Sequence, residues 1–174
     1  MTRETKSDKV DELIAAYRES TSQDGAFDAL AAERLGIGLT DLTCLDLVES
    51  NGGLTAGRLA ELSGLTTGAV TGVLDRLERA GLVERARDAV DRRKVNVAVT
   101  PAHYERSGPI WRPLYEDWHA LLASRFTARE LEVITEFLRA TTELGRRHMG
   151  RLREADGTAC AKPKPPAGRM TDGR

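Results

Sequence analysis

A short stretch of the chain carries small and hydroxyl-bearing residues on one side of an expected helix. On a helical wheel, residues 67–80 place valine and leucine on one face and small or polar side chains on the opposite face. Small residues allow close approach to a groove floor, and threonine can bind phosphates or base edges. The candidate contact residues in and beside this helix are Thr66, Thr67, Gly68, Thr71 and Arg76. These residue types at this spacing favour a helix that enters the major groove of double-stranded DNA.

A basic segment follows this helix. Residues 85–94 carry five basic and two acidic side chains, although the net charge of the chain is −1. Standing alone, such a run is more often a solvated turn. Beside a DNA-binding helix it favours contact of Arg92 and Arg93 with the adjacent minor groove, where the negative potential concentrates.

Two consecutive helices are expected to position the candidate contacts. Thr40 can cap an amphipathic helix that ends at the turn 51–53, and Thr55 can cap the short helix that follows. A turn at 63–65 separates this short helix from a second helix, which ends at Gly81.

After the second helix the apolar pattern changes from helical to alternating. Residues 95–99 alternate as a strand, and residues 82–85 can form its antiparallel partner, with the polar loop 87–93 between them. A helix, a short turn, a helix and a two-stranded ribbon in this order are typical of a winged helix-turn-helix.

The N-terminal region has an interrupted helical pattern. Apolar positions recur at helical spacing in 10–17 and again in 27–35, but residues 20–25 interrupt them. The pattern predicts two helices, or one broken helix, before Gly36.

The C-terminal region predicts two further helices. The first opens at Thr100–Pro101 and carries an aromatic stripe in 111–122, although Pro109 and Pro113 should kink or restart it. The second begins at the capping box formed by Thr127 and Glu130.

The predicted fold is mainly α-helical with a small β-ribbon wing, of the α+β class. A winged helix-turn-helix is flanked by N- and C-terminal dimerisation helices, because these apolar stripes are longer than the winged domain can cover. The predicted regions are 8–38 (dimerisation helices), 39–100 (DNA-binding domain), 101–150 (dimerisation helices) and 155–174 (disordered basic tail).

The central sequence GRLAELSGLTTGAVTGVLDRLERAGLVERARDAVDRRKVNVAVT resembles the core of the MarR family of bacterial transcription factors. The resemblance covers about residues 39–101. Its most specific motifs are Leu39-Thr40, the helix exit Asp75–Arg85, Asp91-Arg92-Arg93 and Val99-Thr100.

The resemblance implies a homodimer that contacts DNA through the second helix and the wing, often with repression relieved by a small ligand. Carried over by position, the recognition helix is 67–80, the wing contact is Arg92 or Arg93, and Asp91 orients an arginine. His103 departs from the glycine common there in the family, and the two prolines depart from the usual dimer helix.

A small aromatic effector is a further expected partner. Four of the eight aromatic residues lie between 104 and 118, so we expect a pocket where the dimer helices meet the winged domain. The candidate wall residues are Trp111, Tyr115 and His119, although an aromatic stripe is more often simple packing.

Other classes of function find little support in the sequence. There is no nucleophile elbow, phosphate-binding loop, dinucleotide fingerprint or zinc-protease motif, so we expect no enzyme activity, no cofactor and no metal. Cys44 and Cys160 form neither a disulfide framework nor a metal knuckle. No apolar run is long enough to cross a membrane and no signal peptide is visible, so a cytoplasmic location is expected.

One alternative function stays open. A winged helix can bind another protein through its helices or ribbon, without sequence-specific DNA binding. A steep loss of duplex affinity with rising salt concentration would favour DNA binding over this alternative.

Overall fold

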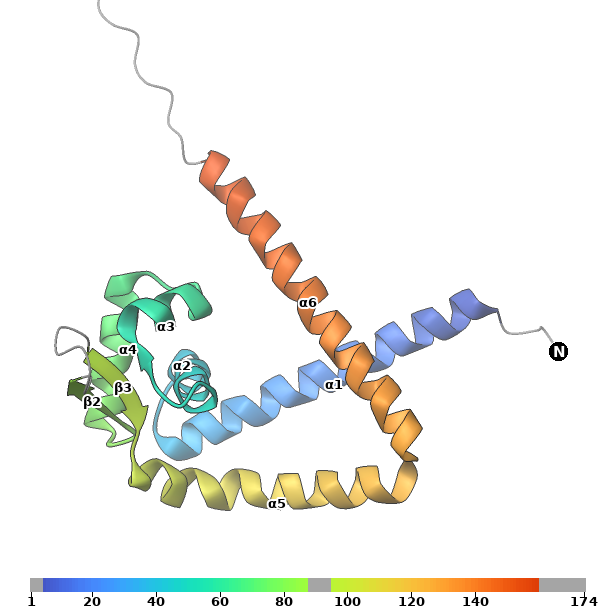
Figure 1. Cartoon of the computed structure of the whole chain (residues 1–174), viewed down its shortest axis with the longest axis horizontal. Coiled ribbons are helices and arrows are strands. Elements are labelled where there is room, and N and C mark those ends of the chain that lie inside the picture. The colour runs from blue at the N-terminus through green and yellow to red at the C-terminus, as the bar shows by residue number, and fades with distance from the viewer. Residues whose placement is uncertain (1–4, 88–94, 160–174) are drawn as a thin grey trace, which may run out of the picture. The chain divides into compact units, whose positions relative to one another are not determined.

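The computed structural model describes residues 5–87 and 95–159 (Figure 1). The chain forms two compact units, Met1–Glu116 and Asp117–Arg174. The elements in chain order are α1 (Lys6–Leu35), α2 (Leu39–Ser50), β1 (Leu54–Thr55), α3 (Ala56–Ser63), α4 (Thr67–Arg79), β2 (Val83–Arg87), β3 (Val95–Val99), α5 (Pro101–Arg125) and α6 (Ala128–Ala159). The predicted mainly helical class with a small antiparallel wing is confirmed.

The wing contains a third strand that the sequence analysis did not predict. The antiparallel sheet has the order β1-β3-β2, and β1 pairs Leu54 with Val97. Gly53 permits this approach, because its φ is +107° and a Cβ atom there would lie 3.2 Å from the carbonyl oxygen of Val97. A strand of two residues is too short to show an alternating pattern, so this pairing is visible only in the fold.

The core of the first unit lies where α2, α3 and α4 gather around the C-terminal end of α1 (Figure 1). Each helix contributes one apolar face, and the strands contribute the valines on one side of the sheet. Burial of each large aliphatic side chain stabilises the fold by about 1.5–3 kcal/mol. The largest fully buried side chains include Leu35, Leu42, Leu45, Leu59, Leu74, Leu77, Leu82 and Val97.

The N-terminal region is one continuous helix, so the expectation of two helices or a broken helix is wrong. α1 begins at a capping box made by Thr5 and Asp8 and ends at Gly36, which has the left-handed conformation with φ +73°. Gly25 lies inside the helix. A glycine there costs only about 1 kcal/mol, which the helical residues on both sides and packing at the C-terminal end can outweigh.

The predicted restart near the prolines of α5 is also wrong, because both Pro109 and Pro113 lie inside one helix. Each proline lacks the N–H that would bond to the carbonyl four residues earlier. The surrounding turn is supported by packing, since Trp111 meets Phe27 of α1 edge-to-face with ring centroids 6.1 Å apart.

The last helix starts as predicted and ends later. The Thr127 amide and hydroxyl each donate to Glu130 Oε2 at 2.8 Å, which confirms the capping box. α6 continues to Ala159, so residues 155–159 are helical where a disordered tail was expected. The remainder of the expected tail, 160–174, lies outside the described residues. In the part of the chain that is described, no helix is long and apolar enough to cross a membrane.

Candidate nucleic-acid interface

The predicted recognition helix is α4, and its two faces differ as the helical wheel requires. Val70, Val73, Leu74 and Leu77 are buried in the core of the first unit. The predicted contact residues Thr66, Thr67, Gly68, Thr71 and Arg76 are all exposed. Gly68 and Thr71 lie on the face opposite the core, whereas Thr67 and Arg76 lie on its two flanks.

The start of α4 is built by Thr66. Its hydroxyl oxygen accepts the Ala69 amide hydrogen at 3.3 Å, so the side chain serves as the N-cap. Nothing lies within 4 Å of the position that a Cβ atom would take at Gly68. The first turn thus presents an open surface at the N-terminus of α4, where the helix dipole suits a phosphate group.

Thr71 lies on the exposed face, one turn after Thr67. Its hydroxyl donates to the Thr67 carbonyl oxygen at 3.0 Å, so the hydroxyl hydrogen is already used inside the helix. The hydroxyl oxygen can still accept a hydrogen bond, and the methyl group remains available. Thr71 is therefore suited to a base that offers a donor or a methyl group.

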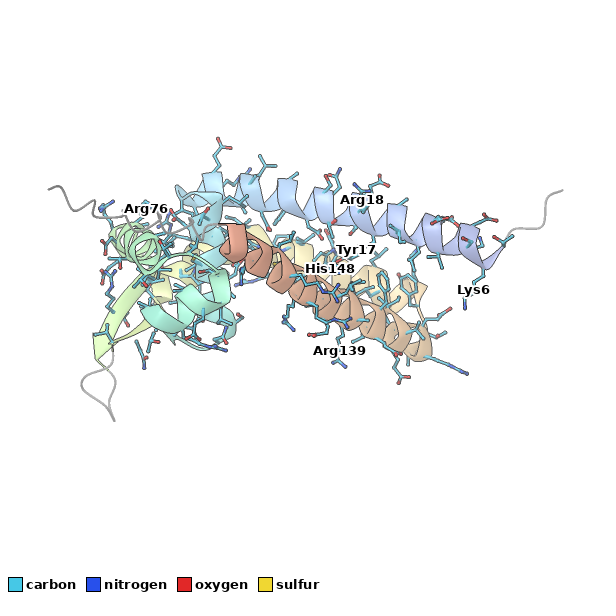
Figure 2. All side chains as sticks on the ribbon, turned by 90° about the horizontal axis from the view of Figure 1, so that it is seen from above. Lys6, Tyr17, Arg18, Arg76, Arg139 and His148 are labelled. Atoms are coloured by element: carbon cyan, nitrogen blue, oxygen red, sulfur yellow. The ribbon has the colours of Figure 1, made fainter. Side chains whose placement is uncertain are left out.

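Arg76 is bound to a carboxylate that the sequence analysis missed. Its Nε lies 2.9 Å from Asp41 Oδ2 and its Nη2 lies 2.6 Å from Asp41 Oδ1, which joins α4 to α2. Arg76 is labelled in Figure 2. Asp41 is buried, whereas half of the Arg76 side chain is exposed. A separation of 35 positions leaves no periodic signal by which this pair could have been found.

The basic segment is partly neutralised at its first residue. Arg85 on β2 donates to Asp75 at 2.6 Å and also binds Glu78, both on α4. These hydrogen bonds raise the pKa of Arg85, that to Asp75 contributing most. Arg85 therefore attaches the strand to the helix. The predicted wing residues Asp91, Arg92 and Arg93 lie outside the described residues, and their roles stay predictions.

A cavity of about 600 Å³ lies between α2 and α5 in the first unit. Trp111 and Tyr115 line it as predicted, whereas His119 is not among the described residues of its lining. The residues that the sequence analysis did not assign to this site include Asp46, Glu49, His103 and Arg112.

Acidic groups dominate the α2 wall of the cavity. Desolvation by the surrounding protein, together with the charges of Asp28 and Glu49, raises the pKa of Asp46 to about 6, and His103 lowers it. Glu49 Oε2 lies 3.1 Å from Nε2 of the buried His103. Across the described residues, no three His, Cys, Asp or Glu side chains are placed to hold a metal ion.

Arg106 connects the cavity helix to two other helices of the first unit. Its Nη1 donates to the Ala80 carbonyl at the end of α4 at 2.7 Å, and its Nη2 donates to the Leu35 carbonyl at the end of α1 at 2.5 Å. A cation is favourable at both helix C-termini. One side chain of α5 thus fixes the C-terminal end of α4.

Comparison with known proteins agrees with this architecture. The sequence model of the MarR family matches residues 37–95. The uncharacterised HTH-type transcriptional regulator YcgE of Bacillus subtilis (strain 168) is 33% identical over 153 residues, which are 88% of this chain and 99% of that protein.

Solved structures show the same fold. The crystal structure of a mutant MepR from a multidrug-resistant S. aureus clinical isolate aligns with a TM-score of 0.62 at 20% identity, covering 75% of this chain and 95% of that one. A second S. aureus MepR mutant, bound to an oligodeoxyribonucleotide, aligns with a TM-score of 0.50 at 21% identity, covering 77% and 96%. The relatives are regulators and not enzymes. By sequence and by fold, this chain belongs to the MarR family of DNA-binding, winged helix-turn-helix transcriptional regulators.

Proposed function

We propose that the protein is a repressor that binds a pseudo-palindromic operator as a homodimer and is released by a small aromatic effector. The observation that carries this proposal is the open face of α4, where Thr66, Thr67, Gly68 and Thr71 are exposed together. The likeness to MepR bound to an oligodeoxyribonucleotide supports DNA as the partner.

The two parts of the DNA surface have different roles in this proposal. Thr67 and Thr71 read base edges in the major groove, where every base pair presents a distinct pattern. Arg92 and Arg93 enter the minor groove, and Asp91 orients one of them. The helix therefore sets sequence preference, and the wing adds affinity for any duplex.

Exposed apolar residues support the homodimer. Val10, Leu13 and Ile14 are about half exposed on α1. No described side chain of α6 is buried, and its exposed apolar residues include Val133, Leu138, Leu144 and Leu152. A folded protein rarely leaves so many apolar groups in water, and a second copy would cover them. Two-fold symmetry then requires half-site centres about 10 base pairs apart.

The cavity between α2 and α5 supports the effector. Trp111 and Tyr115 offer aromatic surfaces, and a volume of about 600 Å³ suits a small molecule. Asp46 and Glu49 on the α2 wall favour a ligand that carries a positive charge. Arg106 supplies a physical connection from α5 to α4 through which an occupied cavity could shift the recognition helix.

The DNA proposal is tested by selecting bound fragments from genomic DNA and measuring fluorescence anisotropy on the selected and a random duplex. Thr71→Ala should reduce the preference for the selected site by about 1–3 kcal/mol and leave random-duplex affinity unchanged. Thr43→Ala is the matched control, because the Thr43 hydroxyl also donates to the carbonyl four residues earlier at 3.0 Å. Equal effects of the two substitutions would contradict base reading by Thr71.

The remaining parts of the proposal have separate readouts. Sedimentation as a monomer at micromolar concentration would refute the homodimer. Arg93→Ala should weaken binding to both duplexes and reduce the salt slope by about 0.9 for each lost phosphate contact. A duplex affinity that does not depend on salt would instead favour a protein-binding module.

The effector is tested with phenyltrimethylammonium and benzoate, which share a ring and differ in charge. Phenyltrimethylammonium should quench the fluorescence of Trp111 and weaken operator binding, with Trp111→Phe identifying the responding tryptophan. If only benzoate binds, the effector carries a negative charge and the proposed positive charge is wrong. If neither compound changes fluorescence or DNA affinity, the cavity is not an effector site for these ligands.

A further inference from the structure

An ion pair between Asp41 and Arg76 lies beside the exposed face of α4. Its two residues come from different helices, α2 and α4, and differ sharply in exposure. The Asp41 side chain is 4% exposed and that of Arg76 is 51% exposed. A buried carboxylate thus holds a guanidinium that still reaches the surface.

The contact geometry leaves one edge of the guanidinium available. Nε and Nη2 of Arg76 face the two Asp41 oxygens at 2.6–3.2 Å. Among the described residues, no hydrogen bond from Nη1 of Arg76 is found. A Cβ atom built at Gly72 would lie 3.5 Å from Nη1, which places that nitrogen beside the exposed face of α4.

Asp41 is itself fixed in place. It is the third residue of α2, where the helix dipole favours a carboxylate, and its Oδ2 also accepts the Gly38 amide hydrogen at 3.4 Å. These contacts hold the buried carboxylate, and its two-point contact with Arg76 orients the guanidinium.

We propose that Asp41 is a positioning residue for DNA binding, which holds Arg76 so that Nη1 donates to a backbone phosphate of the duplex. The proposal rests on the proposed contact of α4 with DNA. A free arginine side chain loses rotamer entropy when it becomes ordered on a phosphate. Because Asp41 has already ordered Arg76 in the unbound protein, phosphate binding does not incur this cost.

Gly72 lies next to Nη1 of Arg76 and leaves the space beside that nitrogen open. A side chain longer than a methyl group at position 72 would occupy the space next to Nη1. The same side chain at Gly68 meets nothing within 4 Å of its Cβ atom. The glycine nearest to Arg76 thus keeps the route from Nη1 to the phosphate open.

The proposal is tested by whether Asp41→Asn strengthens or weakens binding to DNA. By charge alone, Asp41→Asn removes a negative charge and should tighten binding to DNA. If Asp41 positions Arg76, Asp41→Asn should instead weaken binding to both the selected and the random duplex by about tenfold, since a charge-assisted hydrogen bond is lost. Glu33→Gln is the charge-matched control, because Glu33 is an exposed carboxylate on α1, and it should not weaken binding.

The salt slope separates positioning from a purely structural role. Asp41→Asn and Arg76→Ala should each reduce the slope of log affinity against log salt by about 0.9. In the Arg76→Ala background, Asp41→Asn should cause no further loss. A folded Asp41→Asn variant that binds as tightly as the wild type, with the same slope, overturns the proposal.

Arg76→Lys keeps the test decisive if Asp41→Asn does not fold. Lysine leaves a cation beside Asp41 but cannot bind the carboxylate and a phosphate through a planar fork. If the proposal is right, log affinity falls less steeply with log salt for Arg76→Lys than for the wild type. An unchanged slope overturns the proposal. If the wild type itself does not bind duplex with a salt-dependent affinity, the proposed function fails instead.

Discussion

Arg106 is expected to be one of the largest single polar contributors to stability in the first unit. Replacing it with methionine keeps most of the aliphatic stem and removes both hydrogen bonds, to Ala80 at 2.7 Å and to Leu35 at 2.5 Å. A hydrogen bond from a charged donor contributes about 1.5–3 kcal/mol, and solvent exposure of Arg106 places each bond at the lower end. The favourable interaction with two helix C-termini adds about 0.3–1 kcal/mol each.

These contributions predict a loss of about 3.5–5 kcal/mol in the free energy of unfolding for Arg106→Met. Arg106→Lys should lose about half of that amount, because an ammonium group can reach only one of the two carbonyls. Urea denaturation followed by circular dichroism measures both, at one fixed protomer concentration, since dimerisation would make stability depend on concentration.

Arg129→Met is the control for loss of an exposed arginine. Arg129 is exposed on the first turn of α6, and no hydrogen bond from its guanidinium is found among the described residues. The free energy of unfolding of Arg129→Met should stay within about 0.5 kcal/mol of the wild-type value. If Arg106→Met also stays within that range, the double helix-end contact does not stabilise the fold and the reasoning is refuted.

Three further outcomes are expected. The raised pKa of Asp46, about 6, means that the folded state binds more protons than the unfolded state between about pH 4 and 6, so stability falls as pH rises through that range. Asp46→Asn should therefore be more stable than the wild type at pH 7, with no such advantage at about pH 3.5, as urea titrations at the two pH values will show. Burial raises the pKa of the Cys44 thiol, with Asp41 adding to the rise, so in a Cys160→Ser background a thiol reagent should label Cys44 only on unfolding. Gly25→Ala should raise the melting temperature, because it relieves a glycine inside a helix, whereas Gly53→Ala should lower it, because φ is +107° there.

Local patterns in the sequence were sufficient for most elements of the winged domain. The side of α4 that packs inward follows from the spacing of Val70, Leu74 and Leu77, and the structure buries all three. The strand 95–99 follows from its alternation, and it pairs with β2 as expected. Such patterns work because each residue's environment repeats with the period of the element.

The same local rules failed where tertiary packing outweighs a weak local preference. Residues 20–25 and the two prolines of α5 were expected to interrupt their helices, yet α1 and α5 are continuous. An interior glycine costs about 1 kcal/mol and an interior proline about 3 kcal/mol, and contacts such as Phe27 with Trp111 can offset such costs. Strand β1 was missed for a different reason: a strand of two residues is too short to show an alternating apolar pattern.

The sequence by itself determined the class of this protein: the order of its elements, the exposed face of α4 and the motifs of its family can all be read along the chain. Only the tertiary structure decided how the surface is built. Arg76 looks like a free DNA contact in the sequence, but folding places it on Asp41, 35 positions away. Arg106 and the acidic wall of the cavity likewise acquire their roles from segments distant in sequence. The physical reason is that ion pairs and cavities depend on how helices pack against one another, whereas sequence periodicity reports only which face of each helix is buried.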